Sequence, residues 1–421
     1  MRKLKINNLS FVLTMIALCL VISSSFGQHT THGTEDNLKI GIFWPPSWAH
    51  TNDMQYKRLH EAKVDVIQNT TSTDLARPER NKKMLDLALK YKMLVSVADS
   101  LIYGNLEDSK TFINRYKEHP ALFGYYIKDE PTIAELEGYA KKYKELLSLD
   151  IDHVPYLNLF PNFGVEGDYD KEYVERWIEL VGAKNLKYLS FDHYPFKPSG
   201  EFAPRYFENL ESIRRAGIKY NVKTSSYLHS MGIRGSYRRP NVAELRYSVY
   251  SNLAYGIKMP VWFTYYTPTS LTEDFMDSIV ARDGTLTDLY APFKVLNGEI
   301  KALGKTLVSL EAEAVYHIGS EIPKGTPKMP ADFEWKPVSN QDLIVTLFRS
   351  KNSTETYLMI VNKSFEETSK FSMNIAKSVD KVSEIDNKNG RKKSLSYNKA
   401  TNVFADTLLP GGGKLYVLQT N

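Results

Sequence analysis

The pattern that most constrains the fold is an alternation of short apolar runs with helical periodicity across residues 38–308. The short runs are apolar and rich in β-branched or aromatic residues, which is typical of β-strands. Eight strand–helix units within roughly 270 residues match the size of a (β/α)8 barrel. The predicted strands are residues 38–43, 64–69, 94–98, 122–128, 154–160, 188–192, 222–227 and 261–265.

A doubly wound open sheet is the alternative arrangement of the same elements. That fold usually carries a glycine-rich phosphate loop after its first strand. The sequence at that point is Phe43-Trp44-Pro45-Pro46, which contains no glycine. We therefore predict an α/β fold of the TIM-barrel type. Its helices are expected at residues 80–91, 133–147, 171–181, 206–216 and 243–255.

Residues 309–421 show a different sequence pattern. Helical periodicity stops there, and short β-rich runs alternate with turn residues. This pattern predicts a small C-terminal antiparallel β-sandwich as a second domain. No catalytic cluster appears in it, so we expect it to brace the barrel, with glycan binding as the alternative. Its clearest strands are residues 343–348, 356–361, 381–385 and 414–418.

The first 27 residues have the pattern of a secretory signal peptide. Three basic residues precede an apolar run at 11–22, which is too short to span a bilayer comfortably. Small residues predict cleavage near Gly27, which leaves 28–37 as a linker before the barrel. We therefore predict a secreted or periplasmic protein with no membrane span after signal removal.

Composition of the mature chain excludes several kinds of site. Cys19, the single cysteine, lies within the signal, so no disulfide or thiolate chemistry is expected. Losing three basic residues with the signal reduces the net charge from +5 to +2, and a nucleic-acid partner is not indicated. His50, His193 and His229 lack the spacing of metal ligands, so we expect neither a metal nor a cofactor.

The fourth predicted strand ends in Asp129-Glu130-Pro131. Side chains alternate along a strand, so Glu130 should share the inward face with Tyr126. Pro131 then ends the strand because it has no N–H for the ladder. A carboxylate at this position is where a (β/α)8 barrel keeps its chemistry. Asp129 has outward parity and is predicted to cap the next helix or to pair with a cation.

Other strand ends add a second carboxylate, amides and aromatic rings. Asp192 should face inward at the end of strand six, because Leu189 and Phe191 take the outer face. Two carboxylates beside aromatic rings are typical of a glycosidase, in which the carboxyl groups catalyse the reaction and the rings contact the sugar. The predicted catalytic residues are Glu130, as general acid, and Asp192. The predicted substrate-binding residues are Trp44, Tyr126, Asn158, His193, Tyr194, Tyr227, His229, Arg234, Trp262 and Tyr266.

At these residues the chain resembles the clan A glycoside hydrolases, which are (β/α)8 retaining glycosidases whose fourth strand ends in Asn-Glu-Pro. The resemblance implies that Glu130 is the acid/base and that Trp262 is the strand-eight aromatic. Asp129 stands where the family has an asparagine that contacts the sugar 2-hydroxyl. Strand seven, at 224–230, lacks the glutamate that serves the family as nucleophile. The resemblance therefore does not imply the whole double-displacement mechanism.

We hypothesise a secreted glycoside hydrolase that degrades a polysaccharide or oligosaccharide. Strands four and six are not adjacent, so Glu130 and Asp192 are expected to be far enough apart to admit a water molecule. That separation favours inversion, whereas a closer pair favours retention with Asp192 as nucleophile.

Two other functions remain open. One is a non-catalytic carbohydrate-binding barrel that uses the same aromatic and polar groups. The other is a polysaccharide lyase, with Tyr227 or His229 as base and an arginine that neutralises a uronate. Basic residues after strand seven also raise the hypothesis that the carbohydrate is acidic, because guanidinium groups pair with carboxylates and sulfates. These residues are Arg234, Arg238 and Arg239.

Overall fold

The computed structural model describes residues 36–270, 272–338, 341–350 and 355–420. Residues from Asp36 onwards group into one compact unit. The predicted signal peptide and its cleavage point near Gly27 lie outside the described residues. Within the described ranges, no helix has the length and apolar character needed to cross a membrane.

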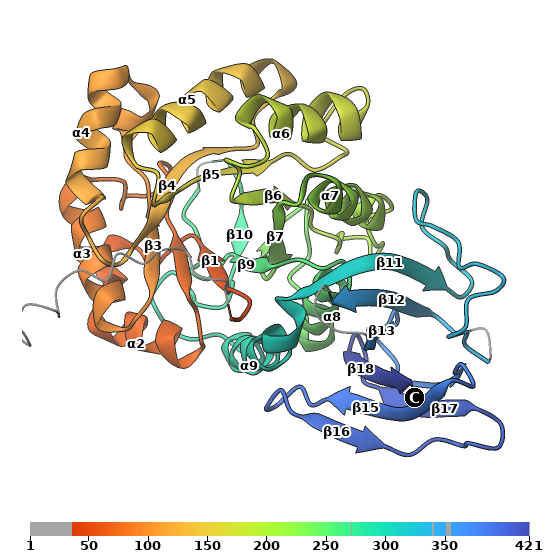
Figure 1. Cartoon of the computed structure of the whole chain (residues 1–421). Helices are drawn as coiled ribbons and strands as arrows, with labels where there is room; N and C mark the ends of the chain where they lie inside the picture. Colours follow the sequence, from red (N-terminus) through yellow and green to blue (C-terminus); the bar gives the residue numbers. More distant parts are fainter. Residues whose placement is uncertain (1–35, 271, 339–340, 351–354, 421) are drawn as a thin grey trace, which may run out of the picture. The chain divides into compact units, whose positions relative to one another are not determined.

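Eight parallel strands close into a barrel (Figure 1), which confirms the predicted fold class. Each strand pairs with the next one along the chain, and the last strand pairs with β1. Every barrel strand overlaps a predicted one, although β9 begins two residues before the predicted start. The strands are β1 (Gly41–Phe43), β2 (Val66–Gln68), β3 (Leu94–Val97), β4 (Leu122–Asp129), β5 (Val154–Leu159), β6 (Tyr188–Asp192), β7 (Lys223–His229) and β9 (Met259–Phe263).

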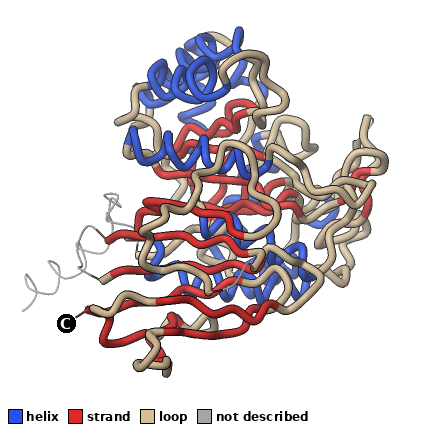
Figure 2. Tube along the Cα trace, turned by 90° about the vertical axis from the view of Figure 1, so that its right-hand side faces the viewer, coloured by secondary structure: helices blue, strands red, loops and turns tan. Residues whose placement is uncertain are grey.

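Helices connect these strands and cover the outside of the barrel (Figures 1 and 2). Their buried residues recur every three or four positions, as in α5, where Leu136, Ala140, Tyr143 and Leu147 face the strands. The α-helices are α2 (Asp53–Glu61), α3 (Pro78–Lys90), α4 (Leu106–Tyr116), α5 (Leu136–Leu149), α6 (Arg176–Val181), α7 (Tyr206–Tyr220), α8 (Val242–Ala254) and α9 (Tyr290–Leu307). Shorter helices are η1 (Trp48–His50), η2 (Ser100–Tyr103), η3 (Ile133–Glu135) and η4 (Tyr169–Glu175).

Strand β4 departs from regular alternation just before its end. Its register against β5 shifts between Tyr126 and Lys128, as an extra residue in one strand produces. The shift reverses the parity of the positions that follow, and Asp129 comes to lie opposite Asn158. The predicted outward direction of Asp129 is therefore wrong. Its predicted capping role is also wrong, because Thr132 caps the following helix.

Two short strands join the loops above the barrel. β8 (Gly232–Ile233), which follows β7, pairs antiparallel with β10 (Phe275–Met276), which follows β9. In this pairing Ile233 lies opposite Phe275. The loops after β7 and β9 are thereby fixed to each other.

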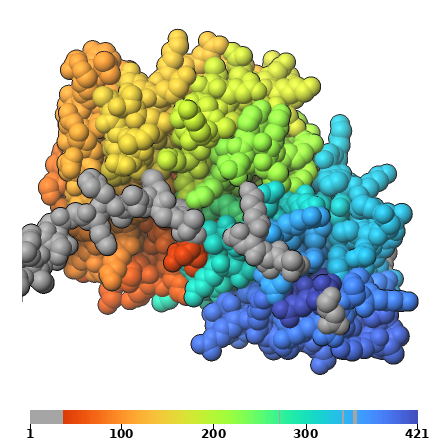
Figure 3. Space-filling model, in the orientation of Figure 1, coloured from red at the N-terminus to blue at the C-terminus, as the bar shows by residue number. Residues whose placement is uncertain are grey.

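The C-terminal strands form a six-stranded antiparallel sheet and a separate two-stranded one, which confirms the predicted sandwich. Apolar residues of β14 and β17 pack against one face of the large sheet. The other face packs on the barrel helices, with α8 against β12 and β13. Figure 3 shows the surface of the last part of this region in blue, next to the cyan surface of the residues that precede it. The strands are β11 (Leu310–Ile318), β12 (Leu343–Ser350), β13 (Thr356–Asn362), β14 (Ser369–Asn374), β15 (Val379–Ile385), β16 (Lys392–Leu395), β17 (Val403–Leu408) and β18 (Gly413–Thr420).

Candidate active site

A cleft of about 290 Å³ opens at the C-terminal ends of the barrel strands. Parallel strands of a closed barrel bring their C-terminal ends to one face, where the following loops surround a common space. The cleft is lined by Phe43, Asp129, Glu130, Asn158, Phe160, Pro161, Phe163, Asp192, His193, Tyr194, Tyr227, Ile233, Tyr237, Phe263 and Glu273.

Glu130 and Asp192 both line this cleft, close enough for the negative charge of Asp192 to raise the pKa of Glu130. Glu130 has a φ of 47°, a left-handed conformation that costs a non-glycine residue about 1–3 kcal/mol. Its backbone N–H donates to the carbonyl of Asn158 on β5 at 2.9 Å. This backbone bond anchors Glu130 on the strand that separates β4 from β6. The expectation that a water molecule fits between the two carboxyl groups stays a prediction.

The pair holds a proton through neutral pH. Burial raises the pKa of Glu130 strongly, and the negative charges of Asp192 and Asp129 raise it further. Burial also raises the pKa of Asp192, but hydrogen bonds that include those from Tyr194 and Asn158 favour its charged form. These effects favour Glu130 as the protonated member of the pair and Asp192 as the charged one. A carboxylic acid that stays neutral near pH 7 can act as a proton donor.

The amide of Asn158 connects the acidic side chains. Its Nδ2 donates to Oδ1 of Asp192 at 3.0 Å and to Oδ1 of Asp129 at 3.2 Å. Its Oδ1 accepts a hydrogen bond from Oγ of Ser190 at 2.9 Å, and that Oγ lies 2.6 Å from the hydroxyl of Tyr156. Because Nδ2 faces two carboxylates and Oδ1 faces a hydroxyl donor, only one orientation of the amide satisfies these contacts. Asp129 is reachable by solvent in the cleft, and partial loss of hydration raises its pKa to about 6.

Aromatic rings form the walls above the carboxyl pair. Phe43 contacts the rings of Tyr227 and Phe263, with centroids 5.3 and 5.6 Å apart. Tyr194 stacks on Phe263 at 5.1 Å and meets Tyr237 edge-on at 5.5 Å. Such rings can hold the apolar face of a sugar.

Six predicted site residues come together in the cleft: Glu130, Asp192, Asn158, His193, Tyr194 and Tyr227. His193 is buried, and its Nδ1 lies 3.1 Å from Oδ1 of Asn209. Burial lowers the pKa of His193 to about 3, so the ring is neutral. It can contribute a hydrogen bond or a surface, but not a positive charge.

Trp262 does not face the cleft, contrary to the prediction. It is fully buried among the outer helices, and its indole N–H donates to Oδ1 of Asn297 at 2.8 Å. Strand β9 turns Val261 and Phe263 inward instead. The aromatic side chain that β9 gives to the cleft is therefore Phe263.

Tyr126 and His229 are also predicted binding residues that lie away from the cleft surface. Tyr126 is 1% exposed and fills the barrel interior near Phe43. His229 is 1% exposed, and its Nε2 lies 2.8 Å from the carbonyl oxygen of Met231. Burial lowers the pKa of His229 to about 3, so it stays neutral.

Trp44, Tyr266 and Arg234 likewise do not line the cleft. Trp44 follows β1 with a φ of 64° and meets the edge of Phe43. The hydroxyl of Tyr266 lies 2.8 Å from Nδ1 of His50. Arg234 forms a 3.0 Å ion pair with Asp274.

The groups expected of a lyase are engaged in other contacts. The hydroxyl of Tyr227 donates to Oε1 of Gln68 at 2.8 Å, and burial raises the pKa of Tyr227 well above its ordinary value. Tyr227 therefore remains protonated, and His229 is buried. Arg238 pairs with Glu244, and Arg239 pairs with Asp288 at 2.5 Å.

Several cleft residues were not predicted. Phe43 and Phe263 each lie one position from a predicted tryptophan, so correct strand parity would have found them. Tyr237 and Glu273 come from the loops that the β8–β10 pairing fixes, and no local periodicity indicates them. The described residues contain no group of three or more His, Asp or Glu side chains arranged as a metal site.

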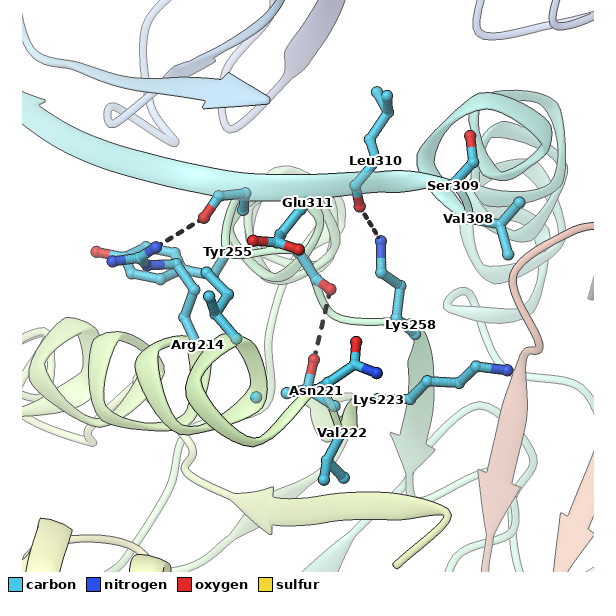
Figure 4. Close-up of a pocket in the computed structure, with 15 residues that line it drawn as sticks. Arg214, Asn221, Val222, Lys223, Tyr255, Lys258, Val308, Ser309, Leu310 and Glu311 are labelled. Atoms are coloured by element: carbon cyan, nitrogen blue, oxygen red, sulfur yellow. Dashed lines mark hydrogen bonds between the residues drawn. The ribbon is translucent and has the colours of Figure 1, made fainter. Parts of the chain in front are cut away.

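A second cavity, of about 350 Å³, opens between α7, the start of β7 and β11, near the N-terminal ends of the strands (Figure 4). Its cations bind backbone carbonyl groups. Nζ of Lys258 donates to the carbonyl of Leu307 at the end of α9, at 2.6 Å. Nη1 of Arg214 donates to the carbonyl of Ala312 at 2.6 Å. These contacts attach β11 to the barrel, and this end of such a barrel supports stability rather than chemistry.

No family model matches the chain, and no curated protein does either. Solved structures do match. A beta-galactosidase from Bacillus circulans sp. alkalophilus is 11% identical, with a TM-score of 0.62 over 91% of this chain and 99% of that one. A family 39 glycoside hydrolase from the gut symbiont Bacteroides cellulosilyticus WH2 is 11% identical, with a TM-score of 0.53 over 92% and 82%. An alpha-L-arabinofuranosidase from Thermotoga maritima is 10% identical, with a TM-score of 0.52 over 91% and 96%.

The chain shares the (β/α)8-barrel fold of these solved structures. At 10–12% identity the likeness concerns the fold. The site must therefore be argued from this chain's own residues.

Proposed function

We propose that this protein is a glycoside hydrolase in which Glu130 is the general acid. The observation that carries the proposal is the presence of Glu130 and Asp192 in one cleft, where burial raises the pKa of Glu130 and favours its protonated form. Cleavage of a glycosidic bond requires one protonated carboxyl group and one carboxylate. The pair provides both in a cleft with aromatic walls.

In the proposed reaction, a glycosidic oxygen accepts a hydrogen bond from Glu130. As the bond between the anomeric carbon and that oxygen breaks, the proton moves from Glu130 to the leaving oxygen. The Asp192 carboxylate then faces the developing positive charge on the sugar. It either takes a proton from an attacking water molecule or bonds to the anomeric carbon itself.

Two residues, Asp192 and Glu273, are candidates for the second catalytic carboxylate. Retaining enzymes hold their carboxyl groups about 5–5.5 Å apart and inverting enzymes hold them farther apart, so the separation in the substrate complex decides between retention and inversion. Glu273 faces the same cleft and forms no ion pair within the described ranges, whereas its neighbour Asp274 pairs with Arg234. Asp192 is our first choice because Asn158 and Tyr194 favour its charged form.

The proposal extends to location and to binding. The basic and apolar pattern of residues 1–27 supports export, so we place the reaction outside the cytoplasm, on a polysaccharide or oligosaccharide. We assign residues 38–308 to the catalytic barrel and 309–421 to the sandwich domain. Asn158, His193, Tyr194 and Tyr227 are the proposed binding residues that share the cleft with the catalytic pair.

A screen for turnover tests the proposal. The purified mature chain is incubated with a panel of polysaccharides and aryl glycosides, beginning with β-galactosides and α-L-arabinofuranosides because proteins of similar fold act on them. Products are followed by proton NMR. Release of a reducing sugar, lost in Glu130→Gln, supports hydrolysis. Binding without turnover on every substrate would instead indicate a non-catalytic carbohydrate-binding barrel, and an unsaturated uronate product would indicate a lyase.

A further inference from the structure

The loop after β6 places a positive charge at the mouth of the cleft. Lys197 is half-buried, with its Nζ 4.2 Å from the ring centroid of Tyr237 and 5.6 Å from that of Phe163. Both rings line the cleft. Phe163 is 50% exposed, so much of its surface is free to contact a ligand.

This ammonium group has no counter-ion. Lys197 forms no ion pair within the described part of the chain, and the pKa of its ammonium is lowered by the loss of water alone. Two other half-buried lysines are compensated: Lys301 bonds Asp65 at 2.6 Å, and Lys258 bonds a carbonyl oxygen at 2.6 Å. Lys197 itself does not line the cleft, but its ammonium lies over two rings that do. A partly desolvated cation without a counter-ion can gain more from a bound anion than a solvated one can.

The three arginines predicted to bind an acidic glycan are already neutralised. Each of them pairs with a carboxylate of the protein, namely Asp274, Glu244 or Asp288. An anionic substituent would have to displace these acids before it could bind. An anion could bind Lys197 without displacing a carboxylate of the protein.

We propose that Lys197, Tyr237 and Phe163 form a subsite for a sugar ring that carries an anionic substituent, either a carboxylate or a sulfate ester. The rings of Tyr237 and Phe163 contact the apolar face of the sugar, and the ammonium binds the anion. The role of this subsite in the reaction rests on the proposed function. With this subsite, the proposed substrate is an anionic glycan.

Binding measurements test the subsite without requiring turnover. Three pairs of sugars differ at C6, where one member carries an anionic group: glucose and glucuronic acid, galactose and galacturonic acid, and galactose and galactose 6-sulfate. Their affinities for Glu130→Gln protein are measured by ligand-observed NMR. At least one charged sugar should bind about tenfold more tightly than its neutral partner. The pair that shows the preference distinguishes a carboxylate from a sulfate ligand.

The preference should disappear in Lys197→Gln and should return in Lys197→Arg. Lys399→Gln is the matched control, because Lys399 lies over the ring of Tyr397 in the sandwich, far from the cleft in sequence. Equal binding within all three pairs, or a preference that survives in Lys197→Gln, would overturn the subsite. Either result would leave hydrolysis by Glu130 untouched, and a failure of hydrolysis would leave the binding result standing.

Discussion

Asn158 donates its side-chain amide to Asp192 at 3.0 Å from the strand that lies between the two carboxyl groups of the catalytic pair. Its backbone carbonyl also accepts the N–H of Glu130. One residue therefore fixes the position of the proposed acid and stabilises the charge on its partner. Asn158 should therefore affect both the stability of the fold and the pH dependence of the reaction, and the two effects can be measured separately.

Asn158→Ala should lower the free energy of unfolding by about 1–3 kcal/mol, because two acidic side chains lose a buried donor. It should also shift the acid limb of the pH–rate profile to higher pH, since Asp192 must be charged to act and is then less easily charged. Urea unfolding and pH profiles check both effects. Asn81→Ala is the control: Asn81 is equally buried and donates to the carbonyl of Ala98 at 2.7 Å, outside the cleft. It should cost stability and leave the profile unchanged. Identical profiles for both variants would contradict the role of Asn158.

Glu130→Gln should make the fold more stable at alkaline pH. The pKa of Glu130 in the folded chain is raised far above its ordinary 4.5, so the folded state binds this proton more tightly than the unfolded state does. Stability from this group is present at acid pH and is lost as the pH rises from 4.5 through the raised pKa. The amide variant cannot lose it. Thermal unfolding between pH 5 and 9 should show a gain for Glu130→Gln that grows with pH, and parallel curves would count against the raised pKa.

Phe263 and Trp262 are adjacent in the chain and should respond differently to mutation. Phe263→Ala removes a ring from the cleft wall and should raise KM several-fold with a smaller effect on kcat. Trp262→Phe leaves Oδ1 of buried Asn297 without its donor and should cost about 1–3 kcal/mol of stability, with KM unchanged. Kinetics and urea unfolding of both variants check this. A raised KM in the Trp262 variant alone would reverse the assignment of the strand faces.

The second carboxylate can be identified by comparing Asp192→Asn with Glu273→Gln. We expect Asp192→Asn to lose hydrolysis by several orders of magnitude while the fold survives, and Glu273→Gln to lose far less. Proton NMR of the first product gives its anomeric configuration, and azide rescue tests whether the lost group was a nucleophile or a base. Full activity in Asp192→Asn together with an inactive Glu273→Gln would move the role to Glu273.

Most of the fold could be predicted from the sequence, because the alternation of strand and helix patterns is a local signal. Side-chain direction could also be predicted where a strand is regular. Asn158, Asp192 and Tyr227 lie in the cleft as strand parity indicated.

The errors have two physical causes. Parity failed at Asp129 because the register of β4 shifts before it. It failed at Trp262 because every residue of β9 is apolar, so the sequence shows no alternation that would mark the inward face. Tyr237, Glu273 and Lys197 lie in loops. The first two are positioned by pairing between β8 and β10, which are more than 40 residues apart in the chain, and periodicity carries no information about such pairing.

The most direct test of the central claim is the rate of Glu130→Gln on two classes of substrate of the same sugar. An unactivated glycan needs a proton at its leaving oxygen, whereas a 2,4-dinitrophenyl glycoside does not. If Glu130 is the general acid, the variant should lose several orders of magnitude in kcat/KM on the glycan and much less on the dinitrophenyl glycoside. An equal loss on both substrates, or full activity on the glycan, would contradict the assignment of Glu130.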